Sequence, residues 1–302
     1  MLTDIEVGYY TDKGNVKEKN QDAVCIEIAD TQYGQVCMAI LCDGMGGEMM
    51  GEYASRKVIE TFENWFETIF PLHIKYDMKL SKIGDMWAKM LVDLDEELRV
   101  FGNSKSIKLG TTATCMLFWN REYILVQLGD SRAYEIKRNL RQLSKDQSYV
   151  QQLVDMKKIS KEEAKMHPKR HVLLDCVGGS RPSTPVCTYG KISKKTRYLL
   201  CSDGFIHMTH DKELRNSLAW YKVRDIATVQ DNLKNTIELL KDRGENDNIT
   251  AVIIHVESLE RKFAFKRKTT SHKGEFHVKR KVVLTEEIQD CEEMQMTTDG
   301  EE

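Results

Sequence analysis

Residues 36–47 read VCMAILCDGMGG, an apolar run that ends in an aspartate and three glycines. The run from Val36 to Leu41 is short and rich in β-forming side chains, which predicts a buried strand. A carboxylate where such a strand ends is costly to bury unless it is paired or binds a metal ion. The glycines permit a tight turn, so the carbonyl of Gly44 can join Asp43 in binding a hard cation. A simple turn between a strand and a helix is the alternative that this stretch leaves open.

Aspartates stand at strand ends elsewhere in the chain. Apolar runs are followed by Asp130 and Asp203, whereas Asp22 and Asp247 stand just before other apolar runs. A single aspartate at such a place is usually a turn residue. Together with Asp43 these five residues could converge on one site. Clustered carboxylates are hard oxygen ligands, which favour magnesium or manganese over zinc.

The apolar segments predict an α+β fold of sheets packed against helices, because strands are followed by helices and then by strands again. The expected strands cover residues 36–41, 112–118, 123–128, 198–201 and 249–256. Two amphipathic helices are expected between the first two strands, one over residues 54–66 and one over residues 83–98. A late helix should run from about Asp225 and stop near Gly244, a residue suited to a helix C-terminus.

The composition excludes several classes of protein. The net charge is −2, so the chain as a whole is not built to bind nucleic acid or an anionic membrane. The eight cysteines contain no C-x-x-C pair, and no stretch is long and apolar enough to span a membrane. The glycine spacing matches neither a dinucleotide fingerprint nor a P-loop. The N-terminus lacks a secretion signal, so we expect a cytoplasmic protein.

The charge pattern changes near the C-terminus. The chain is strongly basic from Arg261 to Lys281 and strongly acidic from Val282 to Glu302. Such blocks rarely build a core. We therefore expect one domain over residues 1–257 and a charged, partly disordered extension over residues 258–302.

A set of short motifs carries a family resemblance. The motifs are GNVKEKNQD at 14–22, DGMGG at 43–47, GTTAT at 110–114, GDSR at 129–132, LSKD at 143–146, SDG at 202–204 and DNIT at 247–250. Each is weak alone. In this order over residues 1–256, they resemble the metal-dependent protein phosphatases, the type 2C Ser/Thr phosphatase family, in its bacterial form.

The resemblance implies a sandwich of two antiparallel sheets flanked by helices in α-β-β-α layers, with a metal site at one edge. It implies hydrolysis of phosphoserine and phosphothreonine by a hydroxide that bridges two Mn²⁺ or Mg²⁺ ions. A third, weaker ion is known in bacterial members. The implied partners are phosphoproteins, namely a Ser/Thr kinase and its substrates, and the implied role is signal transduction.

By the same resemblance, Asp43 bridges the two cations and the Gly44 carbonyl binds one of them. Asp203 and Asp247 bind the other. Asp130 matches the residue that, together with Asp203, holds the third ion. These assignments come from the matching motifs and not from the spacing of the residues.

Three further positions belong to the implied catalytic machinery, and a fourth, Met45, departs from the family pattern. Asp22 would orient metal-bound water. Lys17 stands where the family usually has an arginine that clamps phosphate, and lysine should grip less specifically. Gln21 stands where an acidic residue is frequent, which puts the affinity of one metal in doubt. Met45 replaces the histidine of many eukaryotic members, so that side chain cannot protonate the leaving group.

Residues 144–186 resemble the variable flap of the family, which helps to select substrates. The stretch is polar and contains Ser160 and Glu163 at the spacing of a capping box. We expect a mobile flap in which Lys169 and Arg170 influence peptide preference.

A cysteine phosphatase and a histidine zinc site fit the sequence less well. Cys115 and Arg121 have the spacing of a cysteine phosphatase, but the residues between them are bulky and apolar, so we interpret Cys115 as core. His167 and His171 are four residues apart with a proline between them, which favours a solvated turn over a zinc site. His207 and its neighbour His210 are interpreted as ordinary loop residues.

Two other functions remain open. A two-metal phosphodiesterase would need a basic groove for its polymer, and the motif-bearing region has no concentrated basic run. A pseudophosphatase that only binds phosphoproteins is disfavoured by the complete set of aspartates. Turnover of a simple phosphate ester with manganese would separate these classes.

Overall fold

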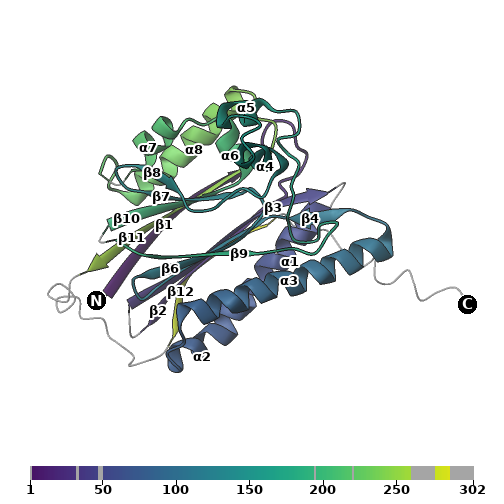
Figure 1. The fold of residues 1–302 in the computed structure, drawn as a ribbon. Coiled ribbons are helices and arrows are strands. Elements are labelled where there is room, and N and C mark those ends of the chain that lie inside the picture. The colour runs from purple at the N-terminus through teal and green to yellow at the C-terminus, as the bar shows by residue number, and fades with distance from the viewer. Residues whose placement is uncertain are drawn as a thin grey trace, which may run out of the picture.

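The computed structural model describes residues 2–31, 34–46, 50–193, 195–219, 221–259 and 276–285. Two antiparallel sheets pack face to face, and helices cover both outer faces (Figure 1). The predicted α+β fold with its α-β-β-α layers is confirmed. In these ranges no helix combines the length and the apolar character needed to cross a membrane.

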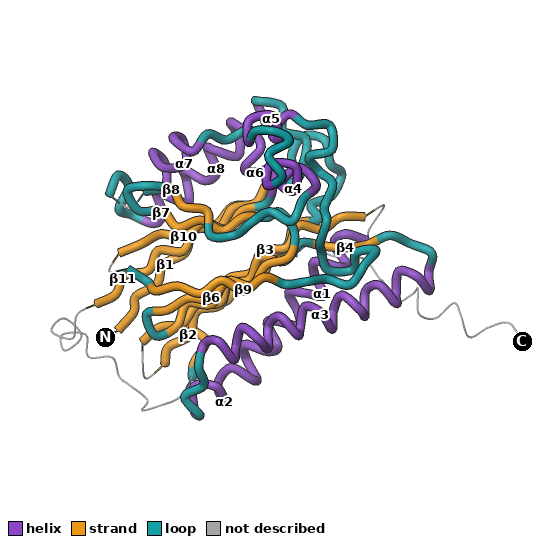
Figure 2. Tube along the Cα trace, viewed as in Figure 1, coloured by secondary structure: helices purple, strands orange, loops and turns teal. Residues whose placement is uncertain are grey.

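The first sheet has the strand order β1-β11-β10-β7-β8. Its strands are β1 (Leu2–Asp12), β7 (Arg132–Ile136), β8 (Leu140–Gln142), β10 (Lys195–Cys201) and β11 (Ile249–Leu259). Its outer face is covered by α6 (Asp203–His207), α7 (Asp211–Leu218) and α8 (Ile226–Asp242), as Figure 2 shows. The expected ends of α8 are confirmed, because the Asp225 side chain accepts a hydrogen bond from the Thr228 amide and Gly244 has a φ of 89°.

The second sheet has the order β12-β2-β3-β5-β6-β9, and a short strand, β4, pairs with β3. Its strands are β2 (Asp22–Thr31), β3 (Gly34–Gly46), β4 (Leu109–Thr111), β5 (Ala113–Trp119), β6 (Glu122–Leu128), β9 (Val186–Lys191) and β12 (His277–Leu284). Its outer face is covered by α1 (Met50–Asn64), a π-helical turn (Trp65–Ile69), α2 (Phe70–Lys75) and α3 (Leu80–Lys105).

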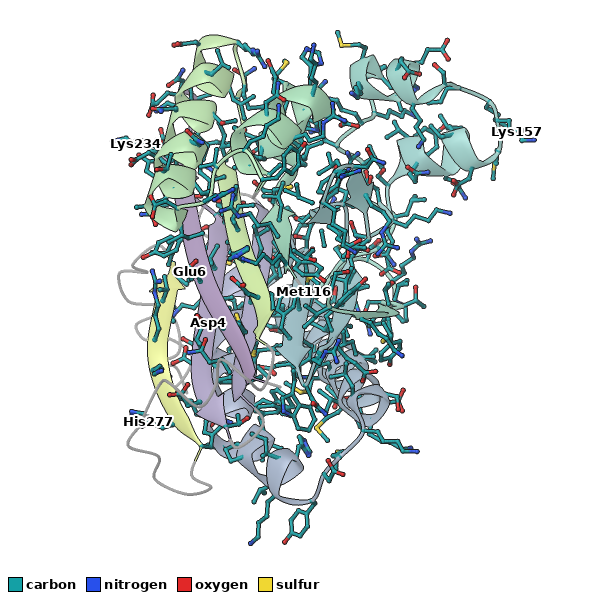
Figure 3. All side chains as sticks on the ribbon, turned by 90° about the vertical axis from the view of Figure 1, so that its left-hand side faces the viewer. Asp4, Glu6, Met116, Lys157, Lys234 and His277 are labelled. Carbon is teal, nitrogen blue, oxygen red and sulfur yellow. The ribbon has the colours of Figure 1, made fainter. Side chains whose placement is uncertain are left out.

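The core consists of three apolar layers. One lies between the two sheets and includes Met116, labelled in Figure 3. A second lies between the second sheet and the helices α1 and α3, where the fully buried Trp87 packs edge-on against Phe62. The third joins the first sheet to α6, α7 and α8. Burial on both faces explains why the central strands β3 and β5 are almost continuously apolar.

The segment 144–186 projects from one end of the sandwich (Figure 3). It contains α4 (Tyr149–Asp155) and α5 (Lys161–Met166), and α5 begins with the expected capping box at Ser160. Lys157, between these helices, lies at the outer tip in Figure 3. The other end of the segment is held by the buried carboxylate of Asp95 in α3, which accepts the amide hydrogens of Gly178 and Ser183 at 2.9 and 3.0 Å.

The C-terminal segment contributes a strand to the second sheet. The strand β11 runs past residue 257 to Leu259, and β12 pairs with β2, so the boundary expected from composition falls inside β11. Phe276 packs edge-on against Phe66 and Phe70, at ring distances of 5.4 and 5.9 Å. Residues 260–275 and 286–302, which carry much of the expected charged extension, lie outside the described residues.

Candidate functional site

The sheet pairing brings the strand-end aspartates to one end of the sandwich. Asp22 begins β2 and lies opposite Asp43 of β3, so the two carboxylates project from the same face. Asp203 follows β10, and Asp247 precedes the neighbouring strand β11. The carboxylates of these aspartates therefore lie close together, as expected from their places at strand ends.

The neighbouring carboxylates add to the effect of burial on the pKa of Asp43. Burial raises the pKa of Asp43 well above its usual range, and the carboxylates of Asp22, Asp203 and Asp247 raise it further. Burial also raises the pKa of Asp130 strongly, with Asp203 as the next cause. Like charges held together in a buried place are unfavourable unless a proton or a cation offsets them. The cluster therefore suits a divalent cation.

Two carboxylate oxygens in this cluster are open to a ligand. The Thr250 hydroxyl donates to Asp22 Oδ2 at 2.5 Å, and burial raises the pKa of Asp22 to about 7. Within the described ranges, Asp22 Oδ1 and Asp203 Oδ1 are buried without a hydrogen-bond partner. Buried acceptors in a native protein are nearly always satisfied, so these two atoms point to a bound cation or an ordered water.

Gly44 lies within β3, where it pairs with Thr111 of β4, and not in the tight turn expected from the sequence, but only glycine fits there. A Cβ at this position would lie 2.4 Å from the Gly51 carbonyl oxygen and 2.6 Å from that of Gln21. Asp43 beside it is held by its backbone, because Thr112 accepts from the Asp43 amide and donates its own amide to the Asp43 carbonyl, both at 2.9 Å. The oxygen donor set of carboxylates and the backbone carbonyl of Gly44 fits Mn²⁺ or Mg²⁺.

Lys17 approaches the cluster from the loop between β1 and β2. Its Nζ lies 2.8 Å from Asp247 Oδ1, and its side chain is 42% exposed. The loop is anchored by Asn248, whose side chain accepts from the Gln21 amide and donates to the carbonyls of Lys13 and Lys19. Lys17 is therefore a cation at the rim of the cluster, with donors left for a further anion.

Gln21 does not stand alone where an acidic residue was anticipated. Its Nε2 donates to Glu52 Oε2 at 2.9 Å, and Lys19 binds the other oxygen of Glu52 at 3.2 Å. Glu52 is buried at the start of α1 and was missed from the sequence. Glu52 comes shortly after the DGMGG motif, but the residues around it do not indicate that it binds Gln21 and Lys19 of the loop before β2.

Asp130 lies in the loop between β6 and β7. It lines a cavity of about 380 Å³ together with Asp203, Arg132 and Arg170. Arg132 is fixed by a forked contact with Asp146, the aspartate of the LSKD motif, at 2.7–3.0 Å. Residues of the segment 144–186, of the first sheet and of α6 line this cavity, and Asp130 and Asp203 belong to the aspartate cluster.

Two histidines, His171 and His207, lie beside the carboxylate of Asp203. His171 Nδ1 is 3.6 Å and His207 Nε2 is 3.5 Å from Asp203 Oδ2. Burial alone would raise the pKa of Asp203, but the two histidines lower it below its usual value. The interpretation of His207 as a loop residue is wrong, since it lies in α6, one turn after Asp203, and is mostly buried. That four-residue spacing was the available signal.

Cys115 is core, as expected. It is fully buried in β5, and burial raises the pKa of its thiol far above the usual value. A neutral, inaccessible thiol cannot act as a nucleophile.

The family profile and the curated relatives that match this chain are all described as phosphatases. The profile of the family described as protein phosphatase 2C matches residues 13–252. The serine/threonine protein phosphatase PstP of Mycobacterium tuberculosis is 33% identical over 257 residues, which cover 82% of this chain. The serine/threonine phosphatase stp of Listeria monocytogenes is 27% identical over 251 residues, covering 82% of this chain and 94% of that protein.

A solved structure of the PstP catalytic domain in complex with two manganese ions is also similar. It has a TM-score of 0.65 and 27% identity, and the match covers 85% of this chain and 100% of that one. By contrast, this chain spans only 44% of the length of the curated PstP protein. The similarity therefore concerns the catalytic part of PstP.

Proposed function

This chain belongs to the protein phosphatase 2C family, and we propose that it is a metal-dependent protein serine/threonine phosphatase. The observation that carries the proposal is the convergence of Asp22, Asp43, Asp203 and Asp247 at one end of the sandwich, with two buried carboxylate oxygens open to a ligand. Supporting it are relatives named as serine/threonine phosphatases.

We assign the metal-holding role to Asp43, the Gly44 carbonyl, Asp203 and Asp247, with Asp130 and Asp203 for a weaker third ion. The hard oxygen donors support Mn²⁺ or Mg²⁺. Bound there, the ions would supply Lewis acidity toward the phosphoryl group and a nucleophile derived from water at neutral pH. The donor atoms, and not a cysteine, would thus define the chemistry.

The remaining residues position the substrate and water. The Thr250 hydroxyl fixes Asp22 through Oδ2, which leaves Oδ1 to accept a hydrogen bond from water. Lys17 holds its ammonium group against Asp247 and has further donors for a phosphate oxygen. Gln21 contributes through its hydrogen bond to Glu52, which sets the position of the loop.

The proposed substrates are phosphoserine and phosphothreonine in proteins, and the proposed partners are a Ser/Thr kinase and its targets. Bacterial relatives support a bacterial signalling role. We also propose a cytoplasmic location, supported by the free thiols of the cysteines in the described ranges.

The test is hydrolysis of phosphothreonine peptides and p-nitrophenyl phosphate while Mn²⁺ or Mg²⁺ is titrated. Wild type should require the metal, and Asp43→Ala should lose activity and tight metal binding. Asp130→Ala should keep the two tighter ions in calorimetry but turn over more slowly. Full activity in excess chelator would contradict the proposal.

Two other outcomes would identify a different function. Binding of phosphopeptide with no turnover at any metal concentration would indicate a pseudophosphatase. Faster hydrolysis of bis-p-nitrophenyl phosphate than of the monoester would indicate a phosphodiesterase.

A further inference from the structure

We propose that His171, Asp203 and His207 form a binding site for Zn²⁺ or a similar transition-metal ion, which clamps the segment 144–186 onto α6. The ligand atoms of the three side chains all lie within 4.8 Å of one another. His171 comes from the projecting segment, whereas Asp203 and His207 belong to α6 on the first sheet. A shared cation would therefore join two parts of the molecule that are far apart in sequence.

The distances fit a shared cation better than hydrogen bonds. The two histidine nitrogens lie 3.6 and 3.5 Å from Asp203 Oδ2, longer than a hydrogen bond of about 2.7–3.2 Å. Ligands about 2.0–2.1 Å from a tetrahedral zinc ion are separated by about 3.3 Å. The rings of His171 and His207 stand edge to face, 5.2 Å apart at an angle of 83°.

An outer carboxylate supports His207 as a ligand. Its Nδ1 faces Glu245 Oε2 at 3.6 Å, while its Nε2 faces Asp203. Glu245 is buried, and its other oxygen is fixed by the amides of Asn246 and Asp247 at 2.8 and 3.1 Å. Metal-binding histidines commonly present their second nitrogen to such a carboxylate. Within the described ranges, His207 Nδ1 and Glu245 Oε2 are buried without a hydrogen-bond partner.

The donor set distinguishes this site from the aspartate cluster. Two of its three protein ligands are imidazole nitrogens, which suit zinc and its neighbours, whereas magnesium and manganese prefer oxygen. It is also different from the weak third position assigned to Asp130 and Asp203. Because Asp203 belongs to both centres, a zinc ion held by the histidines would draw its carboxylate away from the aspartate cluster. We therefore expect zinc to inhibit the enzyme, an effect that rests on the proposed function.

The direct test is the visible spectrum of the full-length protein with Co²⁺ as the probe, in excess Mg²⁺ that fills the oxygen sites. A site with two histidine nitrogens and low coordination number should give an intense absorption band, unlike a six-coordinate oxygen site. His171→Asn and His207→Asn should lose the band, and zinc should displace it from wild type. His207→Gln replaces the second variant if that variant does not fold.

Two other histidines provide matched controls. His167 lies in the same segment, and its Nδ1 accepts the Lys169 amide, which asparagine can also do. His210 precedes α7, where asparagine is a good cap. His167→Asn and His210→Asn should keep the cobalt band.

A second measurement follows the clamp itself. The projecting segment offers trypsin several basic residues, including Lys157 at its tip and the neighbouring Lys158. Zinc should slow cleavage in wild type and in the control variants, but not in His171→Asn, which leaves every cleavage site intact. Equal protection of His171→Asn would contradict a clamp through this residue.

Inhibition completes the test. In assays with Mg²⁺, the zinc concentration that halves each protein's own zinc-free rate should rise on the order of tenfold or more in the His171 and His207 variants. A wild-type cobalt spectrum without the band, or a band unchanged in both variants, would overturn the site whether or not the protein is a phosphatase. A normal band without any phosphatase activity would leave the site standing and refute the proposed function. Equal zinc inhibition of all proteins would overturn the inhibitory role.

Discussion

Thr112 shows how one uncharged residue positions the chemistry of another. It binds both backbone groups of Asp43, and its hydroxyl also contacts that of Ser131 at 2.8 Å. The Asp43 carboxylate is thus presented by a fixed backbone and keeps its oxygens for a ligand. The GTTAT motif therefore matters through the aspartate that it holds, which explains why the motif has no reactive group of its own.

At Lys17, the predicted change is Lys17→Arg. The forked guanidinium can bind phosphate through two hydrogen bonds, worth at most about 1–2 kcal/mol, so KM for a phosphopeptide should fall by up to about tenfold or stay unchanged. Steady-state kinetics measures this. Lys19→Arg is the matched control, because Lys19 binds Glu52. A marked rise in KM for Lys17→Arg would mean that Lys17 does not face phosphate.

Glu27 predicts a dependence of stability on pH. It is fully buried in β2, and burial raises its pKa to about 7 from 4.5. A carboxyl with a raised native pKa adds stability below its unfolded pKa, and that stability is lost as pH rises through about 7. Glu27→Gln should therefore unfold with a free energy higher than wild type by on the order of 1–3 kcal/mol at pH 8.

The same pair of proteins should differ much less at pH 5, where the native Glu27 is already protonated. Urea unfolding at the two pH values measures the difference. An equal gap at both would show that the carboxylate charge is not the cause. Cys25, whose thiol lies 3.8 Å from Glu27 Oε1, should be left unchanged in both proteins.

Among the elements, the projecting segment has a rigid end and an outer end. Asp95 fixes Gly178 and Ser183, whereas α4 and α5 reach away from the sheets. Arg170 lines the cavity beside Asp203, and we expect its charge to face the residues that flank the phosphate of a bound peptide. The segment thus has the placement expected of a substrate-selecting flap, and its mobility stays a prediction.

Arg170→Glu should change the preference among phosphopeptides more than it changes turnover of p-nitrophenyl phosphate, which has no flanking residues for Arg170 to contact. We expect kcat/KM for peptides with acidic flanks to fall several-fold more than for the small ester. Lys157→Glu at the outer tip carries the same charge change and should affect neither. Equal losses on peptide and ester would place Arg170 in the chemistry instead.

The sequence predicted the strands and helices that are strongly apolar. Both long helices and the central strands β3, β5 and β6 were found because burial on both faces makes their signal continuous. The expected strands did not include β1, β2, β7, β8, β9, β12 or the short β4. In β1, buried Ile5 and Val7 alternate with polar residues, and β12 is dominated by basic side chains typical of an exposed edge.

The candidate site could be predicted only as far as local motifs reach. Asp43 and Asp203 stand in short motifs that follow apolar strands, and strand ends in a sheet can meet at one edge. Their convergence could therefore be expected from the sequence. The spacing of Asp203 and His207 could have predicted their contact, but the approach of His171 could not be predicted, because it comes from an irregular segment whose path depends on tertiary contacts. Glu52 was missed because its partner Gln21 lies in an irregular loop 31 residues earlier in the chain.

At the scale of the whole molecule, β12 tests where the domain ends. A chain that stops at Leu259 loses the aromatic contacts of Phe276 and the ion pairs of Lys281 with Glu63 and Glu67. It should still turn over p-nitrophenyl phosphate within a few-fold of wild type, but melt on the order of 5 °C lower.

A chain that stops at Thr285 keeps β12 and should match wild type in both turnover and Tm. Calorimetric melting and the ester assay compare the three proteins. If the chain ending at Leu259 failed to fold, the domain would have to include β12. If all three melted together, β12 would contribute nothing to stability.

The pairing of β2 with β3 has a consequence for refolding. The two strands match from Asp22 opposite Asp43 to Thr31 opposite Gly34. A slip by one residue would turn every side chain of β2 to the opposite face. Such a chain would separate the two carboxylates at the same moment as it spoiled the core. The specific activity after refolding should therefore be proportional to the fraction of molecules with the correct β2–β3 pairing. Molecules with a shifted register should be inactive and not partly active.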